Sequence, residues 1–128
     1  MANITRSISP GNRLTVFTVR GKANADEVID EIVDFLNGAA TPLVLWDFTA
    51  GSLAGIPSEG LQRIVEKGKQ FAEIRLGGRT GIVCSKEVDY GLARMFQSFA
   101  ELARVPFEIS VFRRMEDARA WLDEPQVH

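Results

Sequence analysis

The chain has 128 residues, enough for one domain with one hydrophobic core, and we treat residues 1–128 as that domain. It is 45% hydrophobic and 25% charged, and its net charge of −2 gives no general attraction for nucleic acid or anionic lipid. No apolar run approaches the roughly 20 residues that span a bilayer, and the N-terminus lacks the layout of a signal peptide. The single cysteine, Cys84, excludes an internal disulfide and is typical of a reducing compartment, so we expect a cytoplasmic protein.

Two strands are predicted at the start of the chain. Residues 3–9 alternate weakly between apolar and polar types, and residues 14–19 carry apolar side chains at strand spacing. The residues Pro10, Gly11 and Asn12 between them favour a turn. We therefore expect an antiparallel hairpin over residues 3–20.

The first helix is predicted from its cap and its apolar stripe. Asn24 can cap it, and Glu27 stands three residues on, in the reciprocal position of a capping box. Gly38 supplies a C-terminal stop. The stripe predicted to be buried is Val28, Ile29, Ile32, Val33 and Leu36.

A strand, a loop and a second helix follow. The unbroken apolar run over residues 43–46 predicts a strand, 43–48, that is covered on both faces, and the run stops at Asp47. Small residues then predict a loop over 49–57. A helix over roughly 58–74 is predicted from the spacing of Leu61, Ile64, Val65, Phe71 and Ala72.

The rest of the chain alternates strands with helices. Strands are predicted at 80–84 and 107–112, and helices at about 88–103 and 115–123, with a tail over 125–128. Gly77-Gly78 precedes the first of these strands, and Pro106 ends the longer helix. The wide apolar face of the longer helix consists of Leu92, Met95, Phe96, Phe99, Leu102 and Ala103.

This order of elements predicts an α/β domain. Its sheet is expected to have five strands and to be mixed, with the N-terminal antiparallel hairpin followed by mostly parallel strands, and four helices. In open α/β sheets, ligands and partners bind beyond the carboxyl ends of the strands. We therefore expect the working surface near the loop at 49–57 and the starts of the second and third helices.

Most catalytic chemistry lacks its residues in this chain. The only histidine, His128, is the last residue, so a catalytic triad or a zinc site within one chain is not expected. Neither a phosphate-binding loop nor a dinucleotide fingerprint occurs. The segment Gly51-Ser52-Leu53-Ala54-Gly55 lacks the spacing of a nucleophile elbow. We expect no enzyme, no metal site and no cofactor.

Two polar residues remain as candidates near the predicted loop. Asp47 is either a magnesium ligand or phosphate acceptor, or a carboxylate that ties the following loop through local N–H groups. Ser58 is either a helix N-cap or a phosphorylation site, and these two roles are compatible.

Four further residues are candidates at the same end of the sheet. Leu53 and Ile56, two large apolar side chains among small ones, form either a lid over the core or a contact patch. Tyr90 can line this end of the sheet, although a place on a solvated helix face is the simpler interpretation. Cys84 is interpreted as a packing residue rather than a reactive thiol.

Four segments resemble a known family. The strand end at 45–49, the helix entry at 58–61, the segment 90–95 and the carboxyl-terminal pattern at 111–122 are similar to STAS-type domains. The resemblance is closer to the SpoIIAA-like (STAS/Sec14-like) group of small stand-alone bacterial proteins, and it covers nearly the whole chain. It implies a protein-interaction module in which Ser58 matches a serine that a partner kinase phosphorylates in anti-anti-sigma factors.

These observations lead to two main hypotheses and a third. The first is a non-catalytic regulatory module that docks a partner protein through residues 47–60, with phosphorylation at Ser58. The second is a carrier of a small molecule or lipid, with a cleft between the loop 49–57 and the helix 88–103 lined by Leu53, Ile56, Tyr90 and Phe96. The third is an enzyme that uses Asp47. A homodimer is compatible with each. The residues expected to bind a partner or ligand are Asp47, Thr49, Ser52, Leu53, Ile56, Ser58 and Tyr90.

Overall fold

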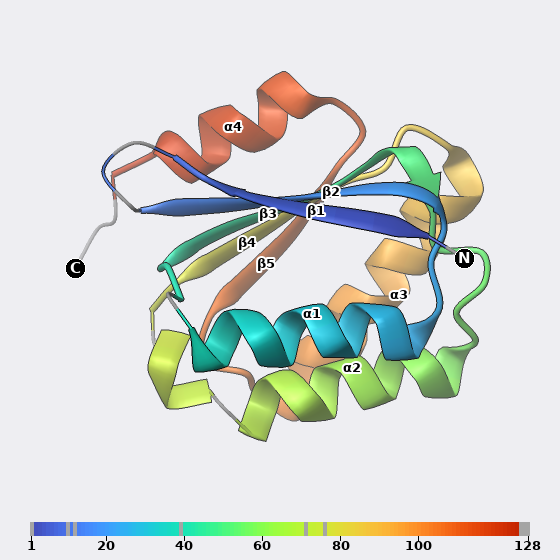
Figure 1. The fold of residues 1–128 in the computed structure, drawn as a ribbon, viewed down its shortest axis with the longest axis horizontal. Helices are drawn as coiled ribbons and strands as arrows, with labels where there is room; N and C mark the ends of the chain where they lie inside the picture. The colour runs from blue at the N-terminus through green and yellow to red at the C-terminus, as the bar shows by residue number, and fades with distance from the viewer. Residues whose placement is uncertain are drawn as a thin grey trace.

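The computed structural model describes residues 2–9, 11, 13–38, 40–70, 72–75 and 77–125. Across these residues the chain forms one five-stranded sheet in the order β1-β2-β3-β4-β5 (Figure 1). Strands β1 and β2 are antiparallel, and every later neighbour is parallel. The elements in chain order are β1 (Asn3–Ile8), β2 (Leu14–Lys22), α1 (Ala25–Asn37), β3 (Leu43–Ser52), α2 (Ser58–Gln70), the 3-10 helix η1 (Ala72–Arg75), β4 (Arg79–Val83), α3 (Glu87–Ala103), β5 (Glu108–Phe112) and α4 (Met115–Asp123).

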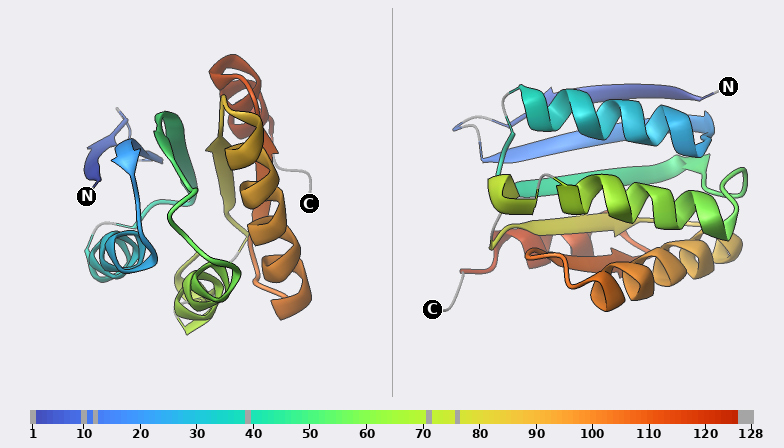
Figure 2. Two further views of the ribbon diagram at one scale, coloured as in Figure 1. Left: turned by 90° about the vertical axis from the view of Figure 1, so that its right-hand side faces the viewer. Right: turned by 90° about the horizontal axis from the view of Figure 1, so that it is seen from below.

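The helices form two unequal layers on the sheet. Helices α1, α2 and α3 lie side by side on one face, and α4 covers the other face (Figures 1 and 2). The larger core lies under the three helices, where the Phe17 ring stacks on Trp46 at 4.2 Å between centroids and meets Phe35 edge-on at 5.5 Å. A smaller core under α4 joins Leu45 and Val83 of the sheet to Ala118 and Leu122. The mixed α/β sheet with four helices is therefore confirmed.

The start of α1 agrees with its prediction in detail. The Asn24 side chain accepts a hydrogen bond from the Glu27 backbone N–H at 2.8 Å, and the Glu27 side chain accepts one from Asn24 N–H at 3.0 Å. The helix ends at a C-cap on Gly38. Of the predicted stripe, Val28 and Leu36 are buried, while Ile29, Ile32 and Val33 are half-buried. The stripe missed Phe35, which is buried.

Strand β3 is longer than predicted, because it continues through Asp47 and Thr49 to Ser52. The reason is β2, which also runs further and pairs with β3 as far as Lys22 opposite Ser52. A Cβ at Gly51 would lie 2.6 Å from the carbonyl oxygen of Val19, so only glycine allows this approach of the two strands. The predicted loop at 49–57 is correspondingly shortened to residues 53–57.

Other boundaries differ from prediction by a few residues. Helix α2 ends at Gln70 and a 3-10 turn follows, in place of one helix to residue 74. Strand β4 lies one residue earlier than predicted at both ends, and β5 starts one residue later than predicted but ends where predicted. The predictions made for Pro10, Asn12, Phe71 and His128 lie outside the described residues. Gly11 of the predicted turn has a positive φ of 88°, which glycine adopts without strain.

Helix α3 confirms its predicted apolar face only in part. Its buried residues are Asp89, Ala93 and Ala100, whereas Met95 and Leu102 of the predicted apolar face are exposed. Phe96 lies between these two sides and is partly buried against the core. Leu92 and Phe99 of the predicted face are also partly buried against the core. The small alanines let the helix pack closely on the sheet between these larger side chains.

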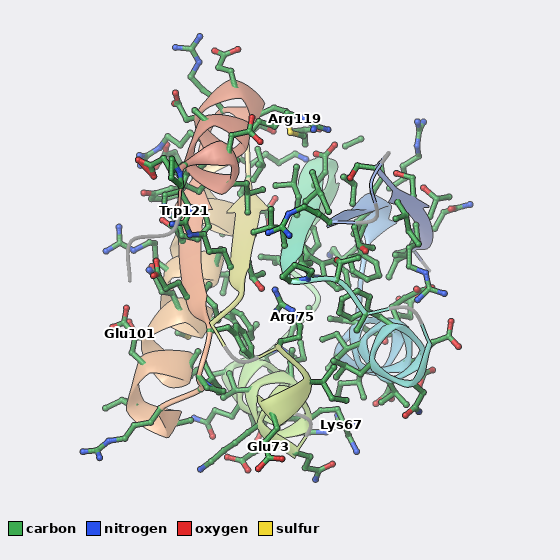
Figure 3. All side chains as sticks on the ribbon, turned by 90° about the vertical axis from the view of Figure 1, so that its left-hand side faces the viewer. Lys67, Glu73, Arg75, Glu101, Arg119 and Trp121 are labelled. Carbon is green, nitrogen blue, oxygen red and sulfur yellow. The ribbon has the colours of Figure 1, made fainter. Side chains whose placement is uncertain are left out.

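A buried arginine holds the opposite, amino-terminal end of the parallel strands. The Arg75 guanidinium donates to the carbonyls of Thr41, Pro42 and Arg79 at 2.9–3.3 Å, and to the Thr80 hydroxyl at 2.8 Å. Figure 3 shows this side chain pointing inward from η1. Burial lowers the pKa of Arg75 to about 10, and none of its hydrogen bonds within the described ranges goes to a carboxylate.

Candidate functional site

The candidate site lies at the carboxyl ends of the parallel strands, around the turn at 53–57 and the starts of α2 and α3. Within the described ranges, no group of three or more histidine, cysteine or acidic residues is arranged to hold a metal ion. Among the described residues, no helix is both long enough and apolar enough to cross a membrane.

Asp89 organises this end of the molecule. It lies in the first turn of α3 and is 0% exposed. Its Oδ1 accepts hydrogen bonds from the Ser52 hydroxyl and the Leu53 backbone N–H, both at 2.9 Å. Its Oδ2 is buried and has no hydrogen-bond partner among the described residues. Because a buried carboxylate needs donors, this residue fixes the last residue of β3 against α3.

The segment that follows β4 supplies hydrogen bonds to the part of β3 that β4 does not reach. Strand β4 ends at Val83, opposite Asp47, while β3 continues for five more residues. The Ser85 hydroxyl donates to the carbonyl of Thr49 at 3.3 Å, and the Lys86 ammonium donates to that of Gly51 at 3.2 Å. Side chains thus satisfy backbone acceptors that a longer β4 would otherwise pair.

The contacts of Asp47 match the second of its two predicted roles, a carboxylate that ties the following residues through local hydrogen bonds. It is half-buried within β3, and its Oδ1 accepts from the Thr49 backbone N–H at 2.9 Å and the Thr49 hydroxyl at 2.7 Å. Both contacts come from a residue two positions along, which is the usual pattern for a local Asx interaction. They fix the backbone between Asp47 and Thr49.

The turn at 53–57 has a buried underside and an exposed outer side. Leu53 and Ile56 are 6% and 2% exposed, and the Ile56 N–H donates to the Leu53 carbonyl at 2.9 Å. These two side chains therefore form a lid over the core, which was one of the two predicted roles. The outward-facing residues, all exposed, are Ala54, Gly55, Pro57, Ser58 and Glu59.

Ser58 is the first residue of α2 rather than its N-cap. The carbonyl of Pro57 accepts the first helical hydrogen bond, from Leu61 N–H at 3.0 Å, which makes Pro57 the cap position. The Ser58 side chain is exposed, and its hydroxyl makes no hydrogen bond to another described residue. It stands where the unpaired N–H groups and the dipole of α2 favour a negative charge.

Tyr90 belongs to a surface cluster beside the site. The Arg113 guanidinium lies over its ring at 3.8 Å and donates two hydrogen bonds to Glu87, at 2.9 and 3.2 Å. These hydrogen bonds, together with the positive charge of Arg113, lower the pKa of Glu87. The cluster connects the start of α3 to the end of β5 and lies apart from the Asp89 contacts.

Asp89 is absent from the site residues predicted from the sequence. A signal was present, because Asp89 continues the spacing of Ala93, Phe96 and Ala100 at one end of the inward side of α3. A lone acid at such a position is usually exposed, and its two partners lie 36 and 37 residues away in the chain. The role of Asp89 follows only from the tertiary structure.

An apolar cavity of about 100 Å³ lies behind the site, between the sheet and helices α1, α2 and α3. Its lining includes Leu53 and Phe96, as predicted for a ligand cleft, but not Ile56 or Tyr90. The cavity is therefore deeper in the fold than the cleft predicted between the loop and the third helix.

Three solved structures resemble the chain over nearly its whole length. An uncharacterised DUF3478-family protein with a SpoIIAA-like fold from Shewanella loihica PV-4 has 21% identity and a TM-score of 0.59, covering 94% of this chain and 93% of its own. The anti-sigma factor antagonist SpoIIAA in its unphosphorylated form has 13% identity and a TM-score of 0.58, covering 96% and 100%. An anti-sigma factor antagonist from Mycobacterium paratuberculosis has 15% identity and a TM-score of 0.65, covering 97% and 96%.

These likenesses establish the fold. No protein-family model matches the chain, and no curated protein matches it. The SpoIIAA-like fold that the sequence resemblance implied is confirmed.

We predict that Asp89→Ala destabilises the protein by about 2–4 kcal/mol, because it leaves the Ser52 hydroxyl and the Leu53 N–H unpaired. Urea unfolding followed by circular dichroism measures the change. Asp30→Ala, which removes an exposed carboxylate from α1, is the control and should change stability by no more than about 0.5 kcal/mol. Equal effects of the two substitutions would contradict the role assigned to Asp89.

We also predict that Cys84 is unreactive in the folded protein. The residue is 0% exposed, and burial, Asp89 and Asp47 raise the pKa of its thiol to about 12. Roughly one thiol in ten thousand is then ionised at pH 8. Native protein should resist iodoacetamide at that pH, while protein unfolded in guanidinium reacts as an ordinary thiol. Labelling of native protein at a rate close to that of unfolded protein would refute this prediction.

Proposed function

We propose that this protein is a non-catalytic regulatory module that docks a partner protein through residues 47–60. One observation carries the proposal: the exposed turn from Ala54 to Glu59 is held from beneath by Asp89 and by the buried side chains of Leu53 and Ile56. A surface segment that is already ordered loses little conformational entropy when a partner binds, which favours affinity.

The similar structures support a regulatory role. Two of them are described as anti-sigma factor antagonists, which are proteins that act on another protein. At 13% and 15% identity they carry only the fold to this chain. The partner of the present protein is proposed to be a protein as well, and it would meet the exposed turn together with the start of α2.

We propose Ser58 as a phosphorylation site that regulates this docking. Its hydroxyl is exposed at the first position of α2, and a phosphate there would meet the positive end of the helix dipole. One of the similar structures is of SpoIIAA in its unphosphorylated form. The added negative charge beside Glu59 would change the surface that the partner contacts.

A ligand carrier is the second candidate, and the apolar cavity favours it. The cavity of about 100 Å³ is lined almost wholly by apolar side chains, with Arg75 and Thr80 as its polar lining. An apolar cavity of similar size in another protein binds small molecules such as benzene. The ligand class would be a small apolar molecule buried between the sheet and the helices.

Docking is tested with a photo-reactive amino acid placed at Ala54. The control position is Arg119, which is exposed on α4, the helix on the opposite face of the sheet. In cells of the protein's own host, the Ala54 position should cross-link to one specific protein and the Arg119 position should not. Failure of both positions, or the same products from both, would refute docking through this turn.

We predict that Ser58→Glu lowers the yield of that cross-link by about tenfold, because it places a second negative charge beside Glu59 in the contact surface. Ser58→Ala should leave the yield unchanged. The phosphorylation proposal would be contradicted by equal yields from Ser58→Glu and Ser58→Ala.

The carrier hypothesis makes a separate prediction. Native mass spectrometry of protein from its own host should reveal a bound apolar molecule, and Ala100→Leu, which fills part of the cavity lining, should lose it. Protein without a bound molecule, or equal binding by the filled variant, would reject this function.

A further inference from the structure

Helix α3 presents an exposed surface on which large and small residues alternate. Val88, Met95 and Leu102 are 61%, 40% and 81% exposed, and they are spaced seven residues apart. Gly91 and Ser98 lie between them and are also exposed. Steps of three and four residues place all five on one side of a helix, at the spacing of a coiled-coil seam. This seam is about 21 Å long, since Leu102 lies fourteen positions after Val88 and each position adds about 1.5 Å.

The fold leaves this seam open. Helices α1, α2 and α3 lie side by side, and α3 is at the edge of their layer, with a helix neighbour on one side only (Figure 2). The inward side of α3 consists of Asp89, Ala93 and Ala100, so the seam is not needed to cover the sheet. Three of the five large apolar side chains exposed in the described residues belong to it. An apolar surface of this kind on a helix indicates an interaction site.

Gly91 has no role within its own domain that requires glycine. It lies inside α3, its φ is not positive, and a Cβ added there would meet no other atom within 4 Å. Glycine inside a helix is unfavourable relative to alanine, so the position is explained by something outside the domain. A second helix that approaches closely provides that explanation. Ser98 likewise presents little bulk, because its hydroxyl lies back on its own helix, 3.2 Å from the carbonyl of Arg94.

We propose that a second copy of this chain packs its α3 antiparallel on this seam. In the two-fold arrangement centred between Phe96 and Gln97, Leu102 of each copy meets Gly91 of the other, and Met95 meets Ser98. Met95 and Leu102 then each face a small residue, which is the complementarity that close packing requires, while Val88 lies beyond the end of the partner helix. A two-fold axis makes the surface match itself, as in most homodimers.

The charges along the seam select this register. Arg94 and Glu101 lie on the same flank of α3, and both are exposed. Figure 3 shows Glu101 pointing away from the fold. In the proposed register Arg94 of each copy lies beside Glu101 of the other, which gives two reciprocal ion pairs. Shifting the register by one heptad in either direction would bring Arg94 beside Arg94, or Glu101 beside Glu101, and like charges disfavour both shifts.

The opposite flank of the seam is apolar in the same register. Leu92 of one copy lies beside Phe99 of the other, and both residues are partly buried against the core of their own domain. The dimer interface would therefore have apolar contacts on one flank, large side chains packed on small ones along its centre, and ion pairs on the other flank. The proposal does not depend on the partner-docking function, since it is argued from residues of α3 alone and from none of the turn at 53–57.

Sedimentation equilibrium over a concentration series that extends to the millimolar range tests the proposal. Wild-type protein should approach twice the monomer mass of 14.2 kDa. Leu102→Asp should abolish the dimer, while Ile74→Asp, which changes an exposed apolar residue elsewhere, should leave it intact. A monomer at every concentration, or a dimer that survives Leu102→Asp, would overturn the proposal.

Two further variants separate this interface from a loss of folding. Gly91→Leu should weaken dimerisation at least about tenfold without lowering the Tm, because the position is open in the monomer and leucine favours helix. Arg94→Glu and Glu101→Arg should each weaken the dimer by about tenfold, and the double variant should restore it. A double variant no better than the single ones would overturn the antiparallel register.

Discussion

The buried carboxylate of Asp89 is the contact on which the carboxyl end of the sheet depends. It joins the first turn of α3 to the last residue of β3 and to the first residue of the turn that follows. That turn then inserts Leu53 and Ile56 into the core and delivers the chain to the start of α2. One carboxylate thus determines where the exposed outer side of residues 54–59 lies. Its second oxygen, without a hydrogen-bond partner in the described part of the chain, makes the position energetically sensitive.

The unequal lengths of the strands explain why a surface forms there. Strand β3 extends beyond the end of β4 because β2 pairs with it as far as Lys22. Gly51 allows the backbones of β2 and β3 to approach closely. Beyond Val83 the chain leaves the sheet, and the side chains of Ser85 and Lys86 donate hydrogen bonds to backbone carbonyls of β3. The result is a short, well-anchored turn at 53–57 rather than a long loop, which suits it to contact another macromolecule.

Local patterns in the sequence predicted much of this fold. The capping box of Asn24 and Glu27 depends on residues three apart, and the order of strands and helices follows from hydrophobic periodicity. The length of β3 was not predictable in this way, because it depends on pairing with a strand about thirty residues earlier. On α3, the predicted apolar face is correct for Leu92, Phe96 and Phe99, which pack on the core, and wrong for Met95 and Leu102, which are exposed. The helix is turned so that its alanines lie closest to the sheet, because small residues allow close approach.

The sequence predicted which end of the sheet carries the candidate residues, but not the contacts that hold them there. Asp47, Ser52 and Ser58 lie at the expected end of the sheet. Asp89, which holds Ser52 and Leu53 in place, has the sequence context of an ordinary surface acid. Its burial follows from partners 36 and 37 residues away, which no local pattern encodes.

The central claim is that residues 53–57 form an ordered surface before any partner binds. Nitrogen-15 relaxation of the free protein tests it most directly, because it reports the order parameter of each backbone amide. Order parameters of about 0.85 are expected for the amides of residues 53–56, equal to those of β3, with a fall confined to the turn in the Asp89→Ala variant; Pro57 has no N–H and gives no signal. Values below about 0.6 in the wild-type protein would contradict it, since the turn would then be a mobile loop.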